Sequence, residues 1–305
     1  MLRFEPEYKM VPWGGRRLED EFGRTLPDGP VGESWELVDL ENHKSCVAQG
    51  PHMGKTLGEL WRAGAMGGSA KGAFPFLLKW LNSENKLSVQ VHPDESACEN
   101  VEGAQPKTES WFVAHTEPGA TLLLGHYPGI DPATLRQAAL GGTVHKWLYE
   151  VAPRVGDMFH IPAGTLHAMG AGFVVLEVQQ PSDTTYRVYD WGRVGLDGEP
   201  REIHLDQAIK AVHFERAGTP KAQRQEVIGP CYVMRYVRGG LELPAGPLRV
   251  LVAHSGAVGL ATEKGDVTLE YGDVAVAEPS DGKIRIASGG TLLLTEPNDD
   301  STDVG

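Results

Sequence analysis

Apolar and polar residues alternate along several short stretches of the chain, which is the pattern of half-buried β-strands. The alternation runs over residues 87–92, 172–180 and 186–191. Turn-forming residues separate such stretches, among them Pro93-Asp94, Pro162-Ala163-Gly164 and Gly239-Gly240. Several short strands at close spacing predict a mainly β protein with a barrel or sandwich architecture.

Three segments have the pattern of helices instead. Thr56-Leu57-Gly58-Glu59 has the spacing of a capping box, which predicts a helix near residues 55–65. Asp131-Pro132 combines an N-cap with a proline at the first helical position and predicts helical structure near 131–150, divided by a double glycine. A third helix is predicted from the spacing of four apolar residues, Leu205, Ala208, Ile209 and Val212.

The chain has a faint internal repeat. Val113-Ala114-His115 recurs as Val252-Ala253-His254, and a length of 305 residues favours about two domains. A polar stretch over 217–225 follows the third predicted helix. We therefore expect a larger domain over residues 1–215 and a smaller β-domain over 216–305.

Charge and composition restrict the partners. The formal net charge of −13 argues against nucleic acid or an anionic membrane, but a basic pocket inside an acidic surface can still bind a small anion. The first ten residues lack the apolar stretch of a signal peptide, and no apolar run reaches the ~18 residues of a membrane span. The cysteines have no C-x-x-C spacing and fit a reducing cytoplasm, so a cytoplasmic protein is expected: Cys46, Cys98 and Cys231.

The first candidate for chemistry is the stretch that ends in His92-Pro93. If it forms a strand, Ser88, Gln90 and His92 share one face, because alternate residues of a strand point the same way. Two of these three side chains can ligate a metal. The alternative is an ordinary solvated strand face that ends at a proline turn.

Two further residues complete a possible metal site. Glu109 stands beside Trp111 and Phe112, where an unpaired carboxylate is costly to bury, so it either binds a cation or faces outward at an edge. His167 closes the pattern G-x5-P-x-G-x2-H, in which the glycines and the proline form a tight hairpin that directs the histidine inward. A histidine held in this way suits a first-row metal, whereas His160 lies before the turn.

Together these segments resemble the type I phosphomannose isomerases (mannose-6-phosphate isomerases) in their short bacterial form, within the cupin superfamily. The first cupin motif uses H-x-H, and Gln90-x-His92 holds the matching places here; the second cupin motif ends in asparagine, where this chain has Ala171. The resemblance implies two cupin, or jelly-roll β-barrel, domains with a small helical insertion. It rests on VPWGG (11–15), GESWELVD (32–39), FPFLLKWLNSENKLSVQVHPDE (74–95), KTESWFV (107–113), IPAGTLHA (161–168) and FVVLEVQQPSDTTYRVYDWGR (173–193).

The resemblance also implies roles for individual residues. One zinc ion per chain would be held by Gln90, His92, Glu109 and His167. The residues expected in catalysis are Arg187, Glu177 and Lys107. The residues expected to bind the phosphate of the substrate are Lys79, Ser88 and Arg193. In the repeat, Lys283 stands where a histidine would be needed, so the second domain is expected to lack a metal site.

For Arg187 the alternative is an ordinary exposed face, since strand alternation would place it with Tyr189 and Trp191. Lys79 lies in the apolar run Phe76-Leu77-Leu78-Lys79-Trp80-Leu81, where it either has a counter-charge or extends to the surface.

The reaction implied by the resemblance is the interconversion of mannose 6-phosphate and fructose 6-phosphate through a cis-enediol, with no nucleic-acid or membrane partner and a monomer or homodimer as the assembly. Two other functions fit the same residues. An iron-dependent cupin oxygenase could use two histidines and a glutamate as a facial triad. A non-catalytic protein could bind a sugar phosphate and keep the metal for structure.

Overall fold

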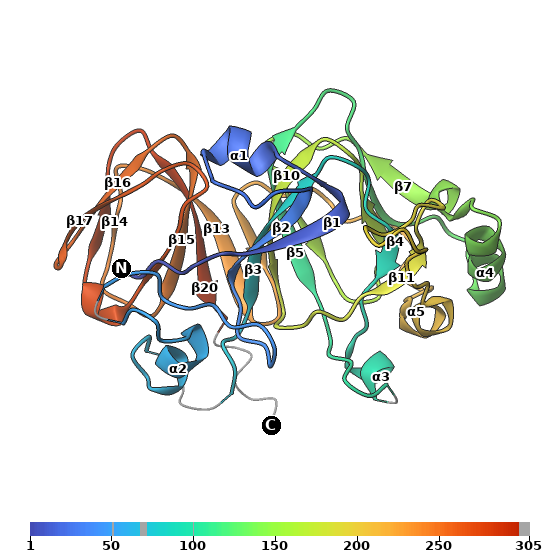
Figure 1. Ribbon diagram of the computed structural model, residues 1–305, viewed down its shortest axis with the longest axis horizontal. Coiled ribbons are helices and arrows are strands. Elements are labelled where there is room, and N and C mark those ends of the chain that lie inside the picture. Colours follow the sequence, from blue (N-terminus) through green and yellow to red (C-terminus); the bar gives the residue numbers. More distant parts are fainter. Residues whose placement is uncertain (51, 68–71, 100, 299–305) are drawn as a thin grey trace.

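The computed structural model describes residues 1–50, 52–67, 72–99 and 101–298, and its described part is built mainly from antiparallel strands in two sandwiches (Figure 1). One sheet of the first sandwich has the order β1 (Glu7–Gly15), β2 (Val31–Leu37), β3 (Leu77–Ser83), β10 (Phe173–Gln179), β5 (Glu109–Thr116), β8 (Met158–Ile161). The facing sheet has the order β11 (Tyr186–Tyr189), β4 (Val89–Val91), β9 (His167–Met169), β6 (Leu122–His126), β7 (Leu148–Val151). The fold therefore confirms the mainly β prediction.

The second sandwich is formed by the C-terminal strands, orange to red at the left of Figure 1. Its inner sheet has the order β12 (Glu226–Ile228), β13 (Tyr232–Arg238), β20 (Thr291–Pro297), β15 (Arg249–Ser255), β18 (Val274–Ala277). Its outer sheet has the order β14 (Glu242–Leu243), β19 (Ile284–Ile286), β16 (Val258–Thr262), β17 (Gly265–Leu269). All these strands follow residue 225, whereas the strands of the first sandwich end at Tyr189.

The two sandwiches share one apolar core. The outward side chains of the six-stranded sheet, such as Phe112 and Leu176, pack in the same cluster as Val250 and Leu293 of the C-terminal inner sheet. Two buried hydrogen bonds cross this contact: the Tyr232 hydroxyl donates to Ser110 Oγ at 2.8 Å, and the Trp80 indole donates to the Gly272 carbonyl at 3.1 Å. The other face of the six-stranded sheet points into the interior of the first sandwich.

The internal repeat occupies matching places in the two sandwiches. Val113-Ala114-His115 lies on β5, and Val252-Ala253-His254 lies on β15. Each strand pairs with the strand that follows a Gly-Asp turn, β8 after Gly156-Asp157 and β18 after Gly272-Asp273. The turns bond alike, since Gly156 N–H donates to the Val113 carbonyl at 2.8 Å and Gly272 N–H to the Ala253 carbonyl at 2.9 Å. The short sequence match therefore marks a repeated piece of structure.

The helices lie outside the sheets. They are α1 (Arg17–Phe22), α2 (Leu57–Arg62), α3 (Glu95–Cys98), α4 (Pro132–Leu140), η1 (Val144–Trp147), α5 (Leu205–Ala211) and η2 (Pro279–Asp281). The Thr56–Glu59 capping box and the Asp131 N-cap are both present. Helices α4 and α5 cover the outer face of the five-stranded sheet of the first sandwich, where Val89 and Val91 pack against them (Figure 1). No helix in the described part of the chain is long and apolar enough to cross a membrane.

Candidate metal centre and the cavity beside it

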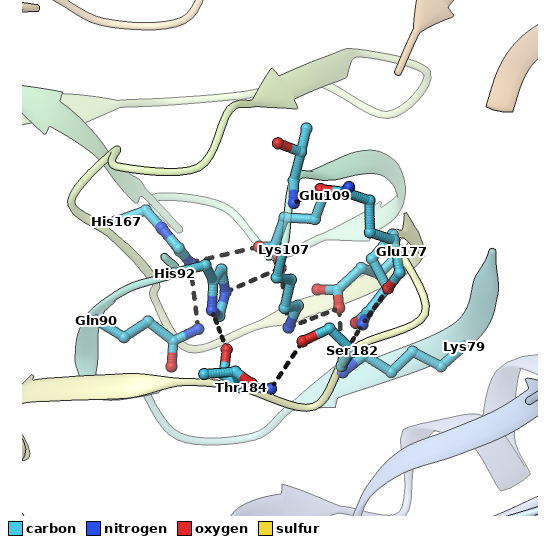
Figure 2. Close-up of polar contacts among 12 residues, drawn as sticks. Lys79, Gln90, His92, Lys107, Glu109, His167, Glu177, Ser182 and Thr184 are labelled. Carbon is cyan, nitrogen blue, oxygen red and sulfur yellow. Dashed lines mark hydrogen bonds and ion pairs between the residues drawn. The ribbon is translucent and has the colours of Figure 1, made fainter. Parts of the chain in front are cut away.

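Three buried side chains lie together inside the first sandwich, from β5, from β9 and from the residue that follows β4 (Figure 2). Glu109 Oε2 lies 3.0 Å from His92 Nε2, and Glu109 Oε1 lies 3.3 Å from His167 Nε2. The ligand atoms that the three residues offer all lie within 4.8 Å of one another. The structure thus brings together His92, Glu109 and His167 as the sequence predicted.

Strand alternation and a glycine turn explain why these three side chains lie together. Val89 and Val91 face the helices, so Gln90 and His92 face the interior. Gly164 has φ +83°, and a Cβ there would lie 1.7 Å from the ring of His213, so the turn requires glycine. The Gly164 N–H donates to the His92 carbonyl at 2.8 Å, which ties the turn before His167 directly to His92.

The ring nitrogens that do not face Glu109 are fixed by backbone carbonyls. His92 Nδ1 lies 2.9 Å from the Thr184 carbonyl, and His167 Nδ1 lies 2.9 Å from the Thr165 carbonyl. An Nδ1–H that donates to a carbonyl leaves Nε2 with a free lone pair. Such carbonyl partners are typical of metal-binding histidines, whose orientation they set.

The cluster is not satisfied by the protein alone. Among the described residues, His92 Nε2 and both carboxylate oxygens of Glu109 are buried without a hydrogen-bond partner of acceptable geometry. Burial and the nearby Lys107 lower the pKa of His92 to about 3, which keeps the ring neutral. Burial would raise the pKa of Glu109, but Lys107 and the histidines outweigh it and hold the carboxyl ionised. Two imidazoles and a carboxylate are a donor set for a divalent first-row metal.

Gln90 is the fourth predicted ligand and lies at the edge of this cluster. Its Nε2 atom is 3.2 Å from His167 Nε2, and its Oε1 atom accepts a hydrogen bond of 3.4 Å from Ser88 Oγ. Rotation of the amide by half a turn would exchange the two atoms and present oxygen to the cluster. Gln90 therefore fits the place of an additional ligand.

A row of alternating charges leads away from the cluster (Figure 2). Lys107 Nζ lies 3.1 Å from Glu109 Oε2 and 3.7 Å from Glu177 Oε1. On the other side, Lys79 Nζ lies 3.0 Å from Glu177 Oε1 and 3.3 Å from Glu33 Oε2. Burial would lower the pKa of Lys79, but Glu177 and Glu33 raise it above its usual value, so the lysine is charged. Lys79 thus has a counter-charge.

Glu177 is fixed from both neighbouring strands. On β10 it stands opposite Lys79 of β3 and Trp111 of β5. The Trp111 indole N–H donates to Oε2 of Glu177 at 2.7 Å, whereas Oε1 has no hydrogen-bond partner of acceptable geometry. The result is a carboxylate with one oxygen held and the other directed towards two ammonium groups.

This row of charges borders a cavity of about 280 Å³ between the two sheets. Arg187 of β11 stands opposite Gln90 of β4 and reaches the same cavity. The lining is Val11, Trp13, Glu33, Lys79, Leu81, Leu87, Ser88, Gln90, Lys107, Glu177, Asp183, Thr185, Arg187 and Arg201. Of the predicted catalytic and substrate residues, the structure brings Arg187, Glu177, Lys107, Lys79 and Ser88 to one space.

The expected grouping of Arg187 with Tyr189 and Trp191 is wrong. Tyr189 and Trp191 line a different cavity of about 450 Å³, together with His145 and Lys86. The pairing of β11 with β4 shifts register between Arg187 and Tyr189, which breaks the alternation. Arg187 therefore lines the cavity beside Gln90 without the two aromatic residues.

Comparisons with known proteins agree on one family. A family model described as "Phosphomannose isomerase type I, catalytic domain" matches residues 1–109. A probable mannose-6-phosphate isomerase of Bacillus subtilis, GmuF, is 36% identical over 243 residues, which cover 78% of this chain and 76% of that protein. The chain belongs to the type I phosphomannose isomerases.

Solved structures of this isomerase family share the whole architecture. The mannose 6-phosphate isomerase from Bacillus subtilis is 30% identical and superimposes with a TM-score of 0.87 over 97% of this chain and 99% of that chain. A mannose 6-phosphate isomerase bound with zinc and yttrium, 16% identical with a TM-score of 0.72, shares the fold over 98% of this chain and 99% of that chain. The cupin-type fold expected from the sequence is thereby confirmed.

One residue that the resemblance placed in this isomerase site does not reach the cavity. Arg193 is not among the lining residues, and its Nε and Nη2 atoms donate to Asp190 Oδ1 at 2.9 and 2.6 Å. Arg201 lines the cavity instead and was missed by the sequence reasoning. Its only sequence signal was its place just before the third helix, which does not distinguish it from any exposed arginine.

Proposed function

We propose that this chain is a zinc-dependent isomerase that interconverts mannose 6-phosphate and fructose 6-phosphate. The observation that carries the proposal is the unsatisfied cluster of His92, Glu109 and His167, which contacts Lys107 and Gln90 of a cavity that Glu177 and arginine also line. A binding protein without catalysis has no need for a carboxylate held on one oxygen beside such a cluster. The membership of the chain in an isomerase family agrees with this chemistry.

One zinc ion per chain would be held by His92, Glu109 and His167, with Gln90 as an additional ligand. The donor set fits zinc, and a solved protein of the same fold was obtained with zinc bound. When bound, the ion supplies Lewis-acid stabilisation for negative charge on the sugar oxygens.

Glu177 is the proposed general base. An aldose–ketose conversion removes a proton from C2 of the sugar and delivers one to C1. The Oε1 atom of Glu177 is the oxygen that Trp111 leaves free, and Glu177 lines the cavity. A carboxylate fixed in this way contributes by its position and by accepting the proton.

Lys107 and Arg187 are proposed to assist with charge. Lys107 lies between Glu109 and Glu177. There it can transfer a proton between O1 and O2 of the sugar, which exchange the roles of carbonyl and hydroxyl oxygen in the reaction. Arg187 brings a permanent positive charge to the same cavity, which stabilises the negative enediolate. The positions of the two side chains support both roles, and substitutions at Lys107 and Arg187 would test them.

For the phosphate, the proposal starts from Ser88, Lys79 and Arg193. Ser88 lines the cavity, and so does Lys79, although its ammonium group lies between two carboxylates. Arg193 lies at Asp190, outside the lining. The phosphate site therefore needs a cationic group that this set does not supply.

The test is a coupled isomerase assay on mannose 6-phosphate, run on the protein as purified, after chelation and after zinc is restored. We expect activity, its loss and its recovery. Oxygen consumption with added iron would support the oxygenase alternative, and sugar-phosphate binding without turnover would support the non-catalytic one. Cytoplasmic location and a monomer or homodimer stay predictions.

A further inference from the structure

Three arginines gather around one carboxylate beside the cavity. Arg201 donates from Nε to Asp190 Oδ2 at 2.7 Å and from Nη2 to Asp190 Oδ1 at 2.8 Å, a bidentate pair. Arg193 donates to the same Oδ1 atom from Nε and Nη2. The Asp190 side chain is 5% exposed, and burial is outweighed by Arg201 and Arg193, which hold the pKa of this carboxyl low. Asp190 is thus ionised, and both of its carboxylate oxygens accept hydrogen bonds from guanidinium groups.

The third arginine, Arg187, is held by the segment that follows Arg201. Its Nη1 atom donates to the Glu202 carbonyl at 2.7 Å, and its own carbonyl accepts the His204 N–H at 2.8 Å. The Arg187 N–H also donates to His204 Nδ1 at 3.2 Å. The positions of Arg187 and Arg201 are therefore fixed by one short stretch of backbone.

The arginine end of the cavity has more positive charge than it can neutralise. Glu33, Glu177 and Asp183 are the carboxylates of the lining, and all three act on Lys79. Burial lowers the pKa of Arg187, and Arg201 lowers it further by repulsion. Near the three arginines, negative charge comes from the buried Asp190 and from Glu202, whose side chain is exposed to water. An anion between Arg187 and Arg201 would relieve this repulsion.

Free donors remain on both of these arginines. Arg187 Nε is buried and, within the residues that the structure describes, has no hydrogen-bond partner. Arg201 uses Nε and Nη2 on Asp190, and in the described part of the chain Nη1 makes no hydrogen bond with the protein. A phosphate group has several acceptor oxygens and suits guanidinium donors of this geometry.

We propose that Arg201 binds the phosphate group of the substrate and that Asp190 is the positioning residue that sets the Arg201 guanidinium, while Arg187 serves the enediolate. The inference rests on the proposed function and replaces Arg193 with Arg201 as the phosphate ligand. Arg193 has a different role, because it also donates to the Lys86 carbonyl and so fastens the loop after β11 to the segment before Ser88.

The test compares mannose 6-phosphate with unphosphorylated mannose in one isomerase assay. Because a hydrogen bond to a charged group is worth a factor of about 10 to 100, we expect Arg201→Gln to lower kcat/KM for mannose 6-phosphate by ~30-fold or more. The value for mannose should stay within about threefold, and Arg201→Lys should recover part of the loss. An equal loss on both substrates, or no loss on either, would overturn the inference.

Three further variants separate binding from positioning. Asp190→Asn should raise KM for mannose 6-phosphate more than it lowers kcat, since the guanidinium loses its bidentate anchor. Arg193→Gln should have a smaller effect on KM than Arg201→Gln. Arg136→Gln removes an exposed ion pair on α4 and is the matched control, expected to match the wild type. A larger effect of Arg193→Gln than of Arg201→Gln would return the phosphate role to Arg193.

Calorimetric titration with inorganic phosphate keeps this inference separate from the isomerase proposal. Wild type should bind phosphate, and Arg201→Gln should weaken that binding by about tenfold or more, whether or not the protein turns sugar over. Phosphate binding without isomerase activity would remove the proposed reaction and leave the arginine site. Phosphate binding that is unchanged in Arg201→Gln would remove the arginine site alone.

Discussion

Glu177 and Lys79 stand directly opposite each other on β10 and β3, with Oε1 and Nζ 3.0 Å apart. Both side chains are almost fully buried. On the far side of Glu177, Trp111 of β5 holds the other carboxylate oxygen. Strand register alone thus places a proposed base between a charge and a hydrogen-bond donor, which makes the pair a direct target for variants.

Glu177→Gln keeps the size of the side chain and can still accept the Trp111 hydrogen bond, but it cannot take a proton. We expect kcat to fall by at least ~100-fold, while KM for mannose 6-phosphate changes little. Steady-state kinetics measure both. Glu202→Gln, at an exposed carboxylate, is the control. A kcat for Glu177→Gln within threefold of wild type would rule out the role of general base.

Lys79→Met leaves Glu33 and Glu177 buried without their shared cation. We expect a loss of about 3–5 kcal/mol in the free energy of unfolding, which urea denaturation measures. Adding Glu33→Gln should restore part of it, because one buried charge is removed. If the double variant is less stable than Lys79→Met, the pairing is not what stabilises this site.

The same pair gives a pH dependence. Burial would raise the pKa of Glu33, but Lys79 lowers it below its usual value of 4.5. A carboxylate with a lowered folded pKa stabilises the fold above its unfolded pKa, and this contribution disappears as the pH falls through the folded value. The stability difference between wild type and Lys79→Met should therefore shrink below pH 4.5. A difference that stays constant down to pH 3 would contradict this.

His167→Ala should lose bound zinc and activity together, because one of the two proposed imidazole ligands is removed. Metal analysis of the purified variant measures the first and the coupled assay the second. His160→Ala is the matched control. His160 is also a histidine on a strand of the first sandwich, but it contacts Ser110 Oγ instead of the cluster. One zinc per chain in His167→Ala would overturn the ligand assignment.

Chelation should destabilise the folded protein as well as inactivate it. Without a cation, His92 Nε2 and the Glu109 carboxylate remain buried and unsatisfied, so the melting temperature should fall and recover with zinc. Differential scanning calorimetry with and without chelator measures the shift. An unchanged melting temperature together with lost activity would show that the metal contributes nothing to the fold.

His254 predicts acid sensitivity at the contact of the two sandwiches. Burial among Phe112, Tyr236 and Tyr271 lowers the pKa of His254 to about 4. The unfolded chain therefore binds a proton more readily, so stability should fall as the pH drops from about 6.5 to 4. His254→Phe should flatten that part of the profile in urea denaturation, and an unchanged slope would count against the explanation.

The fold and the metal cluster could be predicted from the sequence because they depend on local patterns. Period-two alternation placed His92 on the inner face, and the hairpin spacing placed His167 on the same face, opposite Gln90 of β4. The same rule failed for β11, because a register shift after Arg187 turns Tyr189 away from the cavity. A register shift of this kind depends on the pairing with the partner strand, so the alternation of apolar and polar residues in the sequence does not reveal it.

Arg201 could not be predicted for a different reason. It lies after a loop in which Val194 pairs with Pro200, so its side chain returns to the cavity only because the loop doubles back. Asp190 binds both Arg193 and Arg201, two arginines of equal chemistry, and geometry alone decides that Arg201 is the one that reaches the cavity. Sequence spacing favours the nearer one, whereas the folded loop places the farther one in the lining.

The apolar core that joins the six-stranded sheet to the C-terminal inner sheet has a consequence for how the chain unfolds. Phe112 and Leu176 sit on strands whose other faces carry the cavity, so the C-terminal sandwich supports the strands of Glu109 and Glu177 from behind. Separating the sandwiches would expose that face to water. We therefore expect the two to melt in a single calorimetric transition, and a chain ended near residue 215 to be insoluble.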